Sequence, residues 1–154
     1  MGMIKIIPFT EDKKEYIKIL NYEWLQKYFT VEPNDVIQLS DPVKEIVNKG
    51  GLIFYALYNN EIVGTYSLMK INDEEYELAK MAVIESCKGL GIGKLMLVHS
   101  IDEALKLEAK ILSLYSNTKL EAAIHLYRKY GFEQVLLPSD IHYERANIKM
   151  EKKL

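Results

Sequence analysis

The stretch that decides the fold is residues 81–95, MAVIESCKGLGIGKL. It holds three alternating glycines with a lysine on either side: Lys88, Gly89, Gly91, Gly93 and Lys94. Glycine lets successive backbone N–H groups point into one concavity and lets a ligand approach the backbone closely. A helix that begins here adds partial positive charge. The stretch therefore predicts an anion site that suits a pyrophosphate, although a tight strand–helix turn would need the same glycines for its geometry alone.

Three familiar phosphate loops do not fit this stretch. A Walker loop has the form Gly-x-x-x-x-Gly-Lys-Ser/Thr, but here Gly93-Lys94 is followed by Leu95, and position 88 is lysine rather than glycine. The dinucleotide fingerprint is Gly-x-Gly-x-x-Gly, whereas the spacing here is Gly-x-Gly-x-Gly. The protein-kinase loop shares the dinucleotide spacing and fails for the same reason. The spacing therefore indicates a different class of loop.

Hydrophobic periodicity and turn residues predict the elements around this stretch. They are a strand at 3–9, helices at 11–29 and 40–49, strands at 52–58, 61–71 and 75–84, a helix at 91–108, a strand at 111–116, a helix at 119–130, and strands at 132–137 and 143–150. We interpret residues 32–35 as a helix breaker and Asn59-Asn60 as a hairpin turn. The order βααβββαβαββ predicts an α/β (α+β) fold in one domain, residues 1–154, with a mixed, mostly antiparallel sheet flanked by helices.

Composition excludes several classes of protein. The 154 residues carry 20 Lys+Arg against 22 Asp+Glu, a net charge of −2, which argues against a general nucleic-acid coat. Cys87 is the one cysteine, so the chain has no intramolecular disulfide and fits a reducing compartment. One cysteine and three histidines also argue against a structural zinc site. The longest apolar run, residues 52–58, is far short of the roughly 20 residues of a membrane span, so we expect a cytoplasmic protein without a membrane partner.

Two motifs in the second half of the chain resemble one known family. Residues 88–93, KGLGIG, are similar to the acyl-CoA pyrophosphate loop of the GNAT superfamily of N-acetyltransferases, Arg/Gln-x-x-Gly-x-Gly/Ala, with Lys88 at the Arg/Gln position. Residues 122–132, AAIHLYRKYGF, resemble the motif Ala-x-x-Leu-Tyr-x-Lys-x-Gly-Phe that many members carry. The strand expected between the two motifs also matches. The resemblance covers residues 50–150 well, and the first 50 residues only in element order.

The resemblance implies acetyl-CoA as co-substrate and no metal. In that family the strand before the loop has a bulge and diverges from the next parallel strand, and pantetheine lies in the gap between them. The matching positions here are Met81, Ala82 and Val83. The pyrophosphate would bind the backbone N–H groups of Lys88, Gly89, Leu90, Gly91, Ile92, Gly93 and Lys94. Asn117 would reach the pantetheine arm, with capping of the following helix as the alternative.

Two residues are candidates for proton transfer. Tyr127 matches the tyrosine that many members use as a general acid for the leaving thiolate, and simple packing of its ring is the alternative. Glu77 lies six residues before Val83, where some members have a glutamate that accepts the proton of the amine, directly or through water. By strand alternation Glu77 would share a face with Ala79 and Met81, and a solvent-facing glutamate is the alternative.

The resemblance implies direct transfer of an acetyl group to a primary amine of a small molecule or a protein. Residues 21–36 hold aromatic side chains for an acceptor pocket, although Trp24 also suits a core. Residues 142–145 add polar groups, and Arg145 could grip a carboxylate by a bidentate fork, although ordinary surface charge also explains them. Because many members form dimers, a homodimer is one expected state. A GNAT-fold sensor module that binds acyl-CoA without efficient turnover is the alternative, and a different nucleotide-binding protein is a third reading.

Three further side chains enter the sequence prediction in minor roles. His99 and His125 fall inside expected helices and suit partly buried or surface positions better than a base. Cys87 borders the glycine loop, but a covalent acyl-cysteine is not expected in a family that transfers directly.

Overall fold

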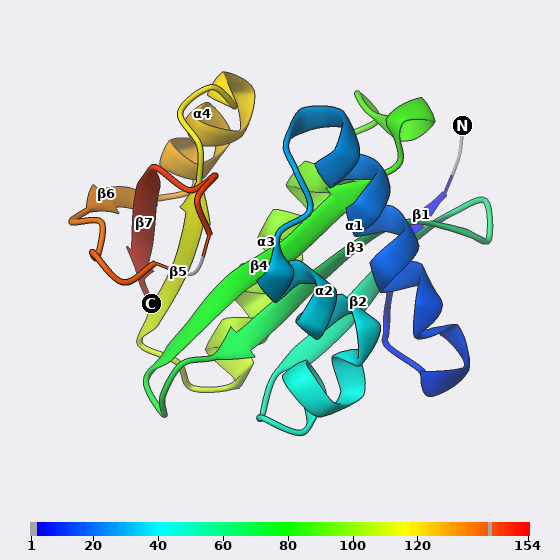
Figure 1. Cartoon of the computed structure of the whole chain (residues 1–154), viewed down its shortest axis with the longest axis horizontal. Helices are drawn as coiled ribbons and strands as arrows, with labels where there is room; N and C mark the ends of the chain where they lie inside the picture. The colour runs from blue at the N-terminus through cyan, green and yellow to red at the C-terminus, as the bar shows by residue number, and fades with distance from the viewer. Residues whose placement is uncertain (1–2, 142) are drawn as a thin grey trace.

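The computed structural model describes residues 3–141 and 143–154, which form a mixed sheet with helices on both faces (Figure 1). Its seven strands lie in the order β1-β2-β3-β4-β5-β7-β6. The elements are β1 (Ile4–Pro8), η1 (Glu11–Lys13), α1 (Glu15–Tyr28), α2 (Pro33–Ser40), η2 (Val43–Val47), β2 (Leu52–Tyr58), β3 (Glu61–Lys70), β4 (Glu75–Val83), η3 (Glu85–Cys87), α3 (Ile92–Lys106), β5 (Ile111–Ser116), α4 (Glu121–Lys129), β6 (Glu133–Val135) and β7 (Ile148–Lys153). Apart from the short η turns, this is the predicted order. The predicted fold class is confirmed, with β4 and β5 parallel and the other neighbouring strands antiparallel.

The β2–β3 hairpin forms where the sequence predicts it. Asn59 and Asn60 have φ angles of 51° and 68°, the left-handed values that a tight two-residue hairpin turn requires. Asparagine tolerates this region better than other residues that carry a Cβ. Two adjacent asparagines therefore set the pairing next to the turn, Tyr58 with Glu61 and Leu57 with Ile62, and the register shifts by one residue at Val63 beyond it.

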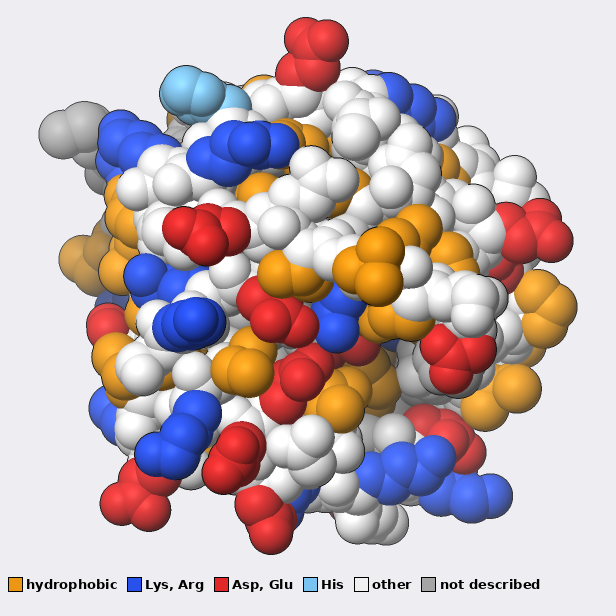
Figure 2. Space-filling model, turned by 90° about the vertical axis from the view of Figure 1, so that its left-hand side faces the viewer, with side chains coloured by type: hydrophobic (Ala, Val, Ile, Leu, Met, Phe, Trp, Pro, Cys, Tyr) orange, Lys and Arg blue, Asp and Glu red, His pale blue; other side chains and the backbone are white. Residues whose placement is uncertain are grey.

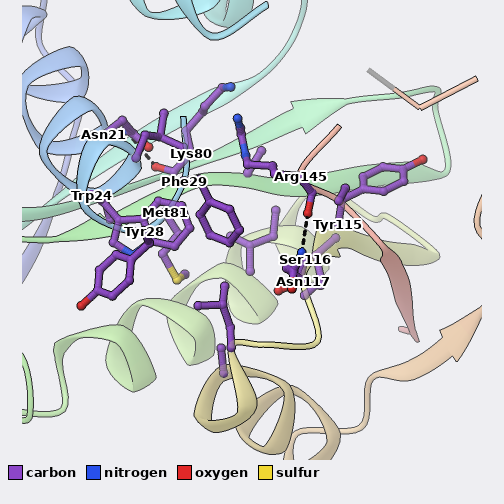
Figure 3. Close-up of a pocket in the computed structure, with 18 of the residues that line it drawn as sticks. Asn21, Trp24, Tyr28, Phe29, Lys80, Met81, Tyr115, Ser116, Asn117 and Arg145 are labelled. Carbon is purple, nitrogen blue, oxygen red and sulfur yellow. Dashed lines mark hydrogen bonds between the residues drawn. The ribbon is translucent and has the colours of Figure 1, made fainter. Parts of the chain in front are cut away.

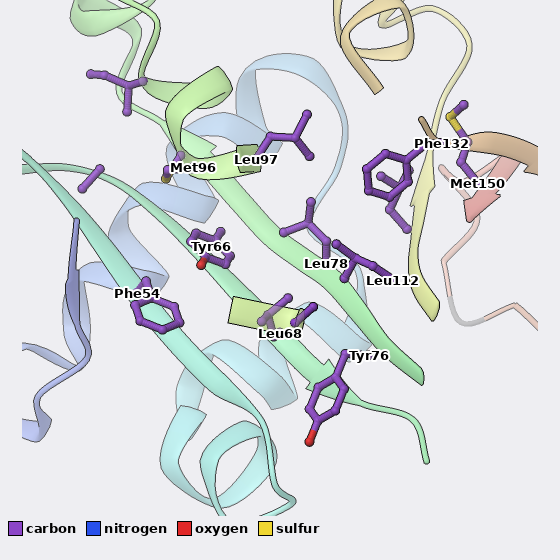
Figure 4. Packing of buried hydrophobic residues seen from close by; sticks show 14 of the residues in the cluster. Phe54, Tyr66, Leu68, Tyr76, Leu78, Met96, Leu97, Leu112, Phe132 and Met150 are labelled. Carbon is purple, nitrogen blue, oxygen red and sulfur yellow. The ribbon is translucent and has the colours of Figure 1, made fainter. Parts of the chain in front are cut away.

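Each face of the sheet buries its own apolar core, because successive strand side chains point to opposite faces. The larger core lies between the sheet and α3 and includes the residues labelled in Figure 4: Phe54, Tyr66, Leu68, Tyr76, Leu78, Met96, Leu97, Leu112, Phe132 and Met150. The smaller core lies under α1, α2 and η2 and consists of Ile17, Leu39, Ile46, Ile53 and Tyr55. Each large side chain buried here contributes roughly 1.5–3 kcal/mol.

The second helix differs from its prediction. Residues 32–35 do not break the chain but begin α2, with Pro33 in the first turn. The carboxylate of Asp35 accepts the backbone N–H of Glu32, and the Glu32 side chain caps the helix in return. Proline is tolerated at a helix start because its missing N–H would have no partner there. The region predicted as a helix from residue 40 holds the end of α2 and the short π-helical turn η2.

Three other boundaries also move. The first long helix begins at Glu15, after a separate turn at η1. The strand predicted at 132–137 is limited to β6. The strand predicted at 143–150 begins only at Ile148, because the backbone before it runs as an irregular segment between α2 and β5.

Strand β4 carries a bulge at Lys80. From Ser67 to Thr65, β3 advances two residues, but the paired positions on β4 advance three, from Ala79 to Ala82. Lys80 takes a left-handed φ of 54° at this point. The extra residue changes which face the later side chains occupy. The bulge implied by the family resemblance is therefore confirmed.

Strands β4 and β5 diverge at the same level of the sheet. Their parallel pairing extends from Glu75–Ile111 to Glu77–Ser113 and no further, although β5 continues to Ser116. Beyond Glu77 the edge of β4 that faces β5 therefore lacks a strand partner. The divergence implied by the resemblance is also confirmed, and it opens the space for a ligand.

The surface shows mixed charge. On the side seen in Figure 2, acidic and basic side chains are interspersed and no continuous area of one sign stands out. In residues 3–141 and 143–154, no helix is long and apolar enough to cross a membrane.

Candidate functional site

The divergence of β4 and β5 opens into a cavity of about 610 Å³. Its walls come from both strands, from the end of α1, from the start of α4 and from the first turn of α3. Figure 3 shows the aromatic side chains of Trp24, Tyr28 and Phe29 on one side and Tyr115 on the other. Ligand pockets commonly measure 300–1,000 Å³, so the cavity suits a ligand of cofactor size.

The glycine loop lies at the α3 end of this cavity. Gly89 and Gly91 have φ angles of 84° and 81°, and Gly91 is the residue before the first turn of α3. A Cβ built on Gly89, Gly91 or Gly93 would meet nothing within 4 Å. The glycines are therefore not required by packing within the chain, and the space in front of them is free for a ligand. The first backbone N–H groups of α3, which lack partners inside the helix, border that space.

Lys88 is turned toward the end of α1. Its Nζ donates to the Tyr28 hydroxyl at 3.0 Å and lies 4.2 Å from the centre of the same ring. It is also 3.7 Å from a Glu85 carboxylate oxygen. Lys94, at the other end of the loop, is exposed on α3. The loop thus has free space in front of its glycines, one lysine that is hydrogen-bonded to Tyr28 and one lysine that is exposed.

Because of the bulge at Lys80, the side chains at the end of β4 do not face the directions that simple strand alternation predicts. Met81, Ala82 and Val83 all line the cavity, as the resemblance implies. Met81 and Val83, however, pack against the core under α3, whereas Glu77 is opposite Met69 on the other face. The prediction that Glu77 shares a face with Met81 is therefore wrong, because straight alternation does not continue through a bulge.

Glu77 lies in the wall of the cavity and is half-buried. Burial raises the pKa of Glu77 to about 7, against the opposing charge of Lys80. Among the described residues it has no salt bridge and no side-chain hydrogen-bond partner. A carboxylate in this state can take up a proton near neutral pH.

Tyr127 projects from α4 and also lines the cavity. Its ring packs beside Phe132, with centroids 5.9 Å apart, and no described residue hydrogen-bonds to its hydroxyl. Burial raises the pKa of Tyr127 to about 12, so the phenol is protonated at neutral pH. The Tyr127 ring therefore packs against the core while its hydroxyl stays available to a ligand in the cavity.

Asn117 has both of its polar side-chain atoms engaged. Its Oδ1 accepts the backbone N–H of Lys119 at 2.9 Å, and its Nδ2 donates to the carbonyl oxygen of Arg145 at 2.8 Å. The residue lines the cavity, but these bonds organise the turn before α4 and the segment before β7. A contact with pantetheine would compete with them.

A buried ionic network that the sequence did not reveal borders the same cavity. Asp35 is fully buried and accepts two bonds from the Arg145 guanidinium, at 2.7 and 2.8 Å, and one from Lys80 at 2.9 Å. Burial alone would raise the pKa of Asp35, but the hydrogen bonds from Arg145 and the charge of Lys80 hold it at about 2. Figure 3 shows Lys80 and Arg145 approaching each other from opposite walls. The fork of Arg145 is thus occupied inside the protein, so neither a grip on a substrate carboxylate nor ordinary surface charge, the two interpretations from the sequence, describes this side chain.

The remaining candidates take the following places. Trp24, Tyr28 and Phe29 line the cavity, whereas Tyr22 packs against the smaller core. His99 lies on the Phe54 ring and its Nδ1 is 2.6 Å from the Tyr66 hydroxyl, while His125 is exposed. Cys87 is buried in the larger core, and His142 lies outside the described residues. The sequence does not predict the contact between Asp35 and Lys80, because it depends on the bulge in β4 and on the position where α2 begins.

Comparisons with known proteins agree on one family. The family model of the GNAT acetyltransferases matches residues 15–132. An uncharacterised N-acetyltransferase of Bacillus subtilis strain 168, YvbK, is 30% identical over 116 residues, covering 71% of this chain and 75% of the relative. A GNAT-family acetyltransferase structure from Staphylococcus aureus Mu50 has a TM-score of 0.86 at 23% identity, with 98% of this chain and 99% of that chain covered. Another, from Elizabethkingia anophelis with acetyl-CoA bound, has a TM-score of 0.67 at 26% identity, with 98% of each chain covered. The chain therefore belongs to the GNAT family of acetyltransferases.

Proposed function

We propose that this protein is an acetyl-CoA-dependent N-acetyltransferase that moves the acetyl group directly to a primary amine. One observation carries the proposal: a single cavity borders the glycine loop, the free edge of β4, Tyr127 and Glu77. Loop, strand edge, proton donor and proton acceptor are the parts that direct acyl transfer from a thioester needs. The related structure from Elizabethkingia anophelis holds acetyl-CoA, which supports this choice of co-substrate.

The backbone would supply most of the co-substrate contacts. The open N–H groups at Gly91 to Lys94 suit a pyrophosphate, because a helix start attracts negative charge. The edge of β4 at Met81–Val83 offers unpaired backbone groups to an extended amide chain such as pantetheine. Acetyl-CoA supplies an activated acyl group on sulfur. An N–H on this edge would stabilise the negative charge that develops on the thioester oxygen.

Glu77 would remove the proton of the acceptor. An ammonium has no free electron pair, so the amine must lose a proton before it attacks. A carboxylate with a pKa near 7 accepts protons at neutral pH more readily than an ordinary glutamate. A water molecule between Glu77 and the amine would serve equally well.

Tyr127 would assist the departure of the thiolate. A phenol with a pKa of about 12 is a weaker acid than a thiol, whose ordinary pKa is about 8.5. Its contribution is therefore a hydrogen bond that strengthens as charge develops on the sulfur, rather than early and complete proton transfer. Tyr127 remains a donor over the whole physiological pH range.

The decisive test is ligand-induced stabilisation, followed by turnover. Thermal unfolding with CoA, acetyl-CoA, ATP and NAD, each at about 1 mM, should show stabilisation by the two CoA species and none by NAD. A ligand that binds only the native state adds about 2.7 kcal/mol at a hundredfold excess over Kd. Release of free CoA thiol is then measured with a panel of amines. No stabilisation by CoA would refute the proposal, and binding without turnover of any amine would favour the sensor module.

A further inference from the structure

A second, smaller cavity of about 180 Å³ lies on the face of the sheet that carries α2. Its walls come from the end of β3, from α2 and η2, and from the irregular segment before β7. Four residues line both this cavity and the larger one: Glu77, Tyr115, Tyr143 and Ala146. Glu77 is therefore accessible from two sides.

Tyr143 forms the rigid part of the wall between the two cavities. Its hydroxyl accepts a hydrogen bond from Lys80 Nζ at 2.7 Å and donates one to Gln38 Oε1 at 2.6 Å. Lys80 borders the larger cavity and Gln38 borders the smaller one. These bonds hold the ring in place, and Glu77 faces both cavities beside it.

The charges around the smaller cavity are almost all paired. Glu45 binds Lys49 at 2.8 Å, and Lys70 lies 3.3 Å from Asp73. Within the described part of the chain, Glu77 is the charged lining residue of this cavity that lacks an ionic partner.

The two cations whose charges act on Glu77 are also occupied. Lys80 binds the buried carboxylate of Asp35, and Lys149 lies 3.3 Å from a Glu151 oxygen and 3.8 Å from a Glu75 oxygen. The site thus offers one unpaired negative charge and, among the described residues beside it, no equally buried unpaired positive charge. It matches a ligand that carries one ammonium group and no carboxylate.

The rest of the small cavity is mainly apolar. Its lining includes Ile46, Met69, Ile71 and Ile141, with the ring of Tyr115. A second charged group in this space would lose its hydration without gaining an ionic partner, which is unfavourable. The volume is below that of a drug-sized pocket, so the body of the ligand must be small.

We infer that the acceptor is a small primary monoamine with an uncharged, largely apolar body, which occupies the second cavity and presents its amine to Glu77. The inference rests on the proposed function and narrows its substrate class. Polyamines and amino acids would be poor acceptors, because each brings a second charge that the cavity does not match.

Two matched pairs of amines test the charge argument. Pentylamine and 1,5-diaminopentane differ by one ammonium group, and phenethylamine and phenylalanine differ by one carboxylate. With acetyl-CoA and the wild-type protein, kcat/KM is measured from the release of CoA thiol. It should be at least tenfold higher for pentylamine than for 1,5-diaminopentane, and at least tenfold higher for phenethylamine than for phenylalanine. Equal or higher values for the charged members would overturn the inference. So would binding of acetyl-CoA with turnover of none of the four, whereas a failure to bind acetyl-CoA would instead refute the proposed function.

A pair of exposed isoleucines tests the location. Ile71 lies at the rim of the second cavity and is 50% exposed, while Ile37 on α2 is 54% exposed and lines neither cavity. Ile71→Trp should lower kcat/KM for pentylamine at least tenfold and leave the Kd of acetyl-CoA unchanged, whereas Ile37→Trp should change neither. Thermal unfolding confirms that both variants fold. If Ile71→Trp retained wild-type kcat/KM, the acceptor would not occupy this cavity.

Discussion

Burial raises the pKa of Glu77 to about 7, and this pKa predicts how the rate of acetyl transfer depends on pH. With a pKa of about 7, Glu77 is protonated in acid and loses its function as a base. We expect kcat/KM for the amine to fall below pH 7 with a slope of one, and Glu77→Gln to remove this limb and lower the rate roughly 10²- to 10⁴-fold. Profiles of the wild type and the variant between pH 5.5 and 9 check this.

A neighbouring carboxylate provides the control for that experiment. Glu75 lies two residues earlier on β4 and is bound to Ser113 and Lys149, outside both cavities. Glu75→Gln should keep the acid limb, shifted slightly to lower pH because a negative neighbour is removed. An acid limb that survives in Glu77→Gln would show that another group is the base.

The same pKa also predicts a change in stability. The folded-state pKa of Glu77, about 7, is above its ordinary value of 4.5, so between these pH values the folded protein holds a proton that the unfolded chain releases. The stabilisation from this proton is complete below pH 4.5 and is lost as the pH rises through 7. Glu77→Gln should therefore exceed the wild type in free energy of unfolding at pH 8 by on the order of 1–3 kcal/mol, with a much smaller difference at pH 5. Urea titrations at both pH values measure it, and an equal difference at both would contradict the assigned pKa.

Tyr127 offers a test that separates catalysis from packing. Tyr127→Phe keeps the ring beside Phe132 but removes the hydroxyl, so kcat should fall more than tenfold with little change in acetyl-CoA affinity. Tyr130 directly follows α4 and packs against the same core, but it does not line the cavity. Tyr130→Phe should therefore leave kcat within twofold of the wild type. An unchanged kcat in Tyr127→Phe would remove this residue from the mechanism.

Among the elements, the turn from β4 into α3 combines strain and ligand space. Gly91→Val would place a branched side chain at a φ of 81° and fill the open space before the helix start. We expect loss of measurable CoA binding by calorimetry. Gly50→Val, at a φ of 94° at the other end of the sheet, carries similar backbone strain and an added contact with Lys70, and it should destabilise the protein without changing CoA affinity. Normal CoA affinity in a folded Gly91→Val protein would place the site elsewhere.

The elements also show how far the sequence could predict this structure. Strand 111–116 and the Asn59-Asn60 turn were predictable because their signals are local, in apolar runs and residues that tolerate positive φ. The start of α2 was missed because Glu-Pro-Asn-Asp resembles a loop until its reciprocal capping bonds are seen. The bulge at Lys80 has no glycine to mark it, and it depends on the pairing of β4 with β3. Motif positions therefore predicted part of the cavity lining, such as Val83, Gly93 and Tyr127, but the face of Met81 and the role of Arg145 depend on the bulge and on tertiary contacts and could not be predicted.

At the scale of the whole molecule, Asp35 connects three parts that are distant in sequence. Its carboxylate holds Lys80 on β4 and Arg145 in the segment before β7, and it also caps α2. Removing one partner of a buried ionic network leaves the others uncompensated, which costs about 3–5 kcal/mol. Asp35→Asn should therefore lower the free energy of unfolding by that amount in urea at pH 7, while the exposed Asp102→Asn should change it by less than about 0.5 kcal/mol.

The same substitution distinguishes a structural network from one that also shapes the site. Because Asp35 fixes Lys80, and Lys80 fixes the Tyr143 hydroxyl, loosening it should disturb the wall beside Glu77 and leave the glycine loop intact. At a temperature where Asp35→Asn remains folded, we expect a raised KM for the amine and an unchanged Kd for acetyl-CoA. A parallel loss of both would mean that the network supports the two cavities as one unit. An unchanged KM for the amine would mean that the wall holds its position without the charges, and that the network contributes to stability alone.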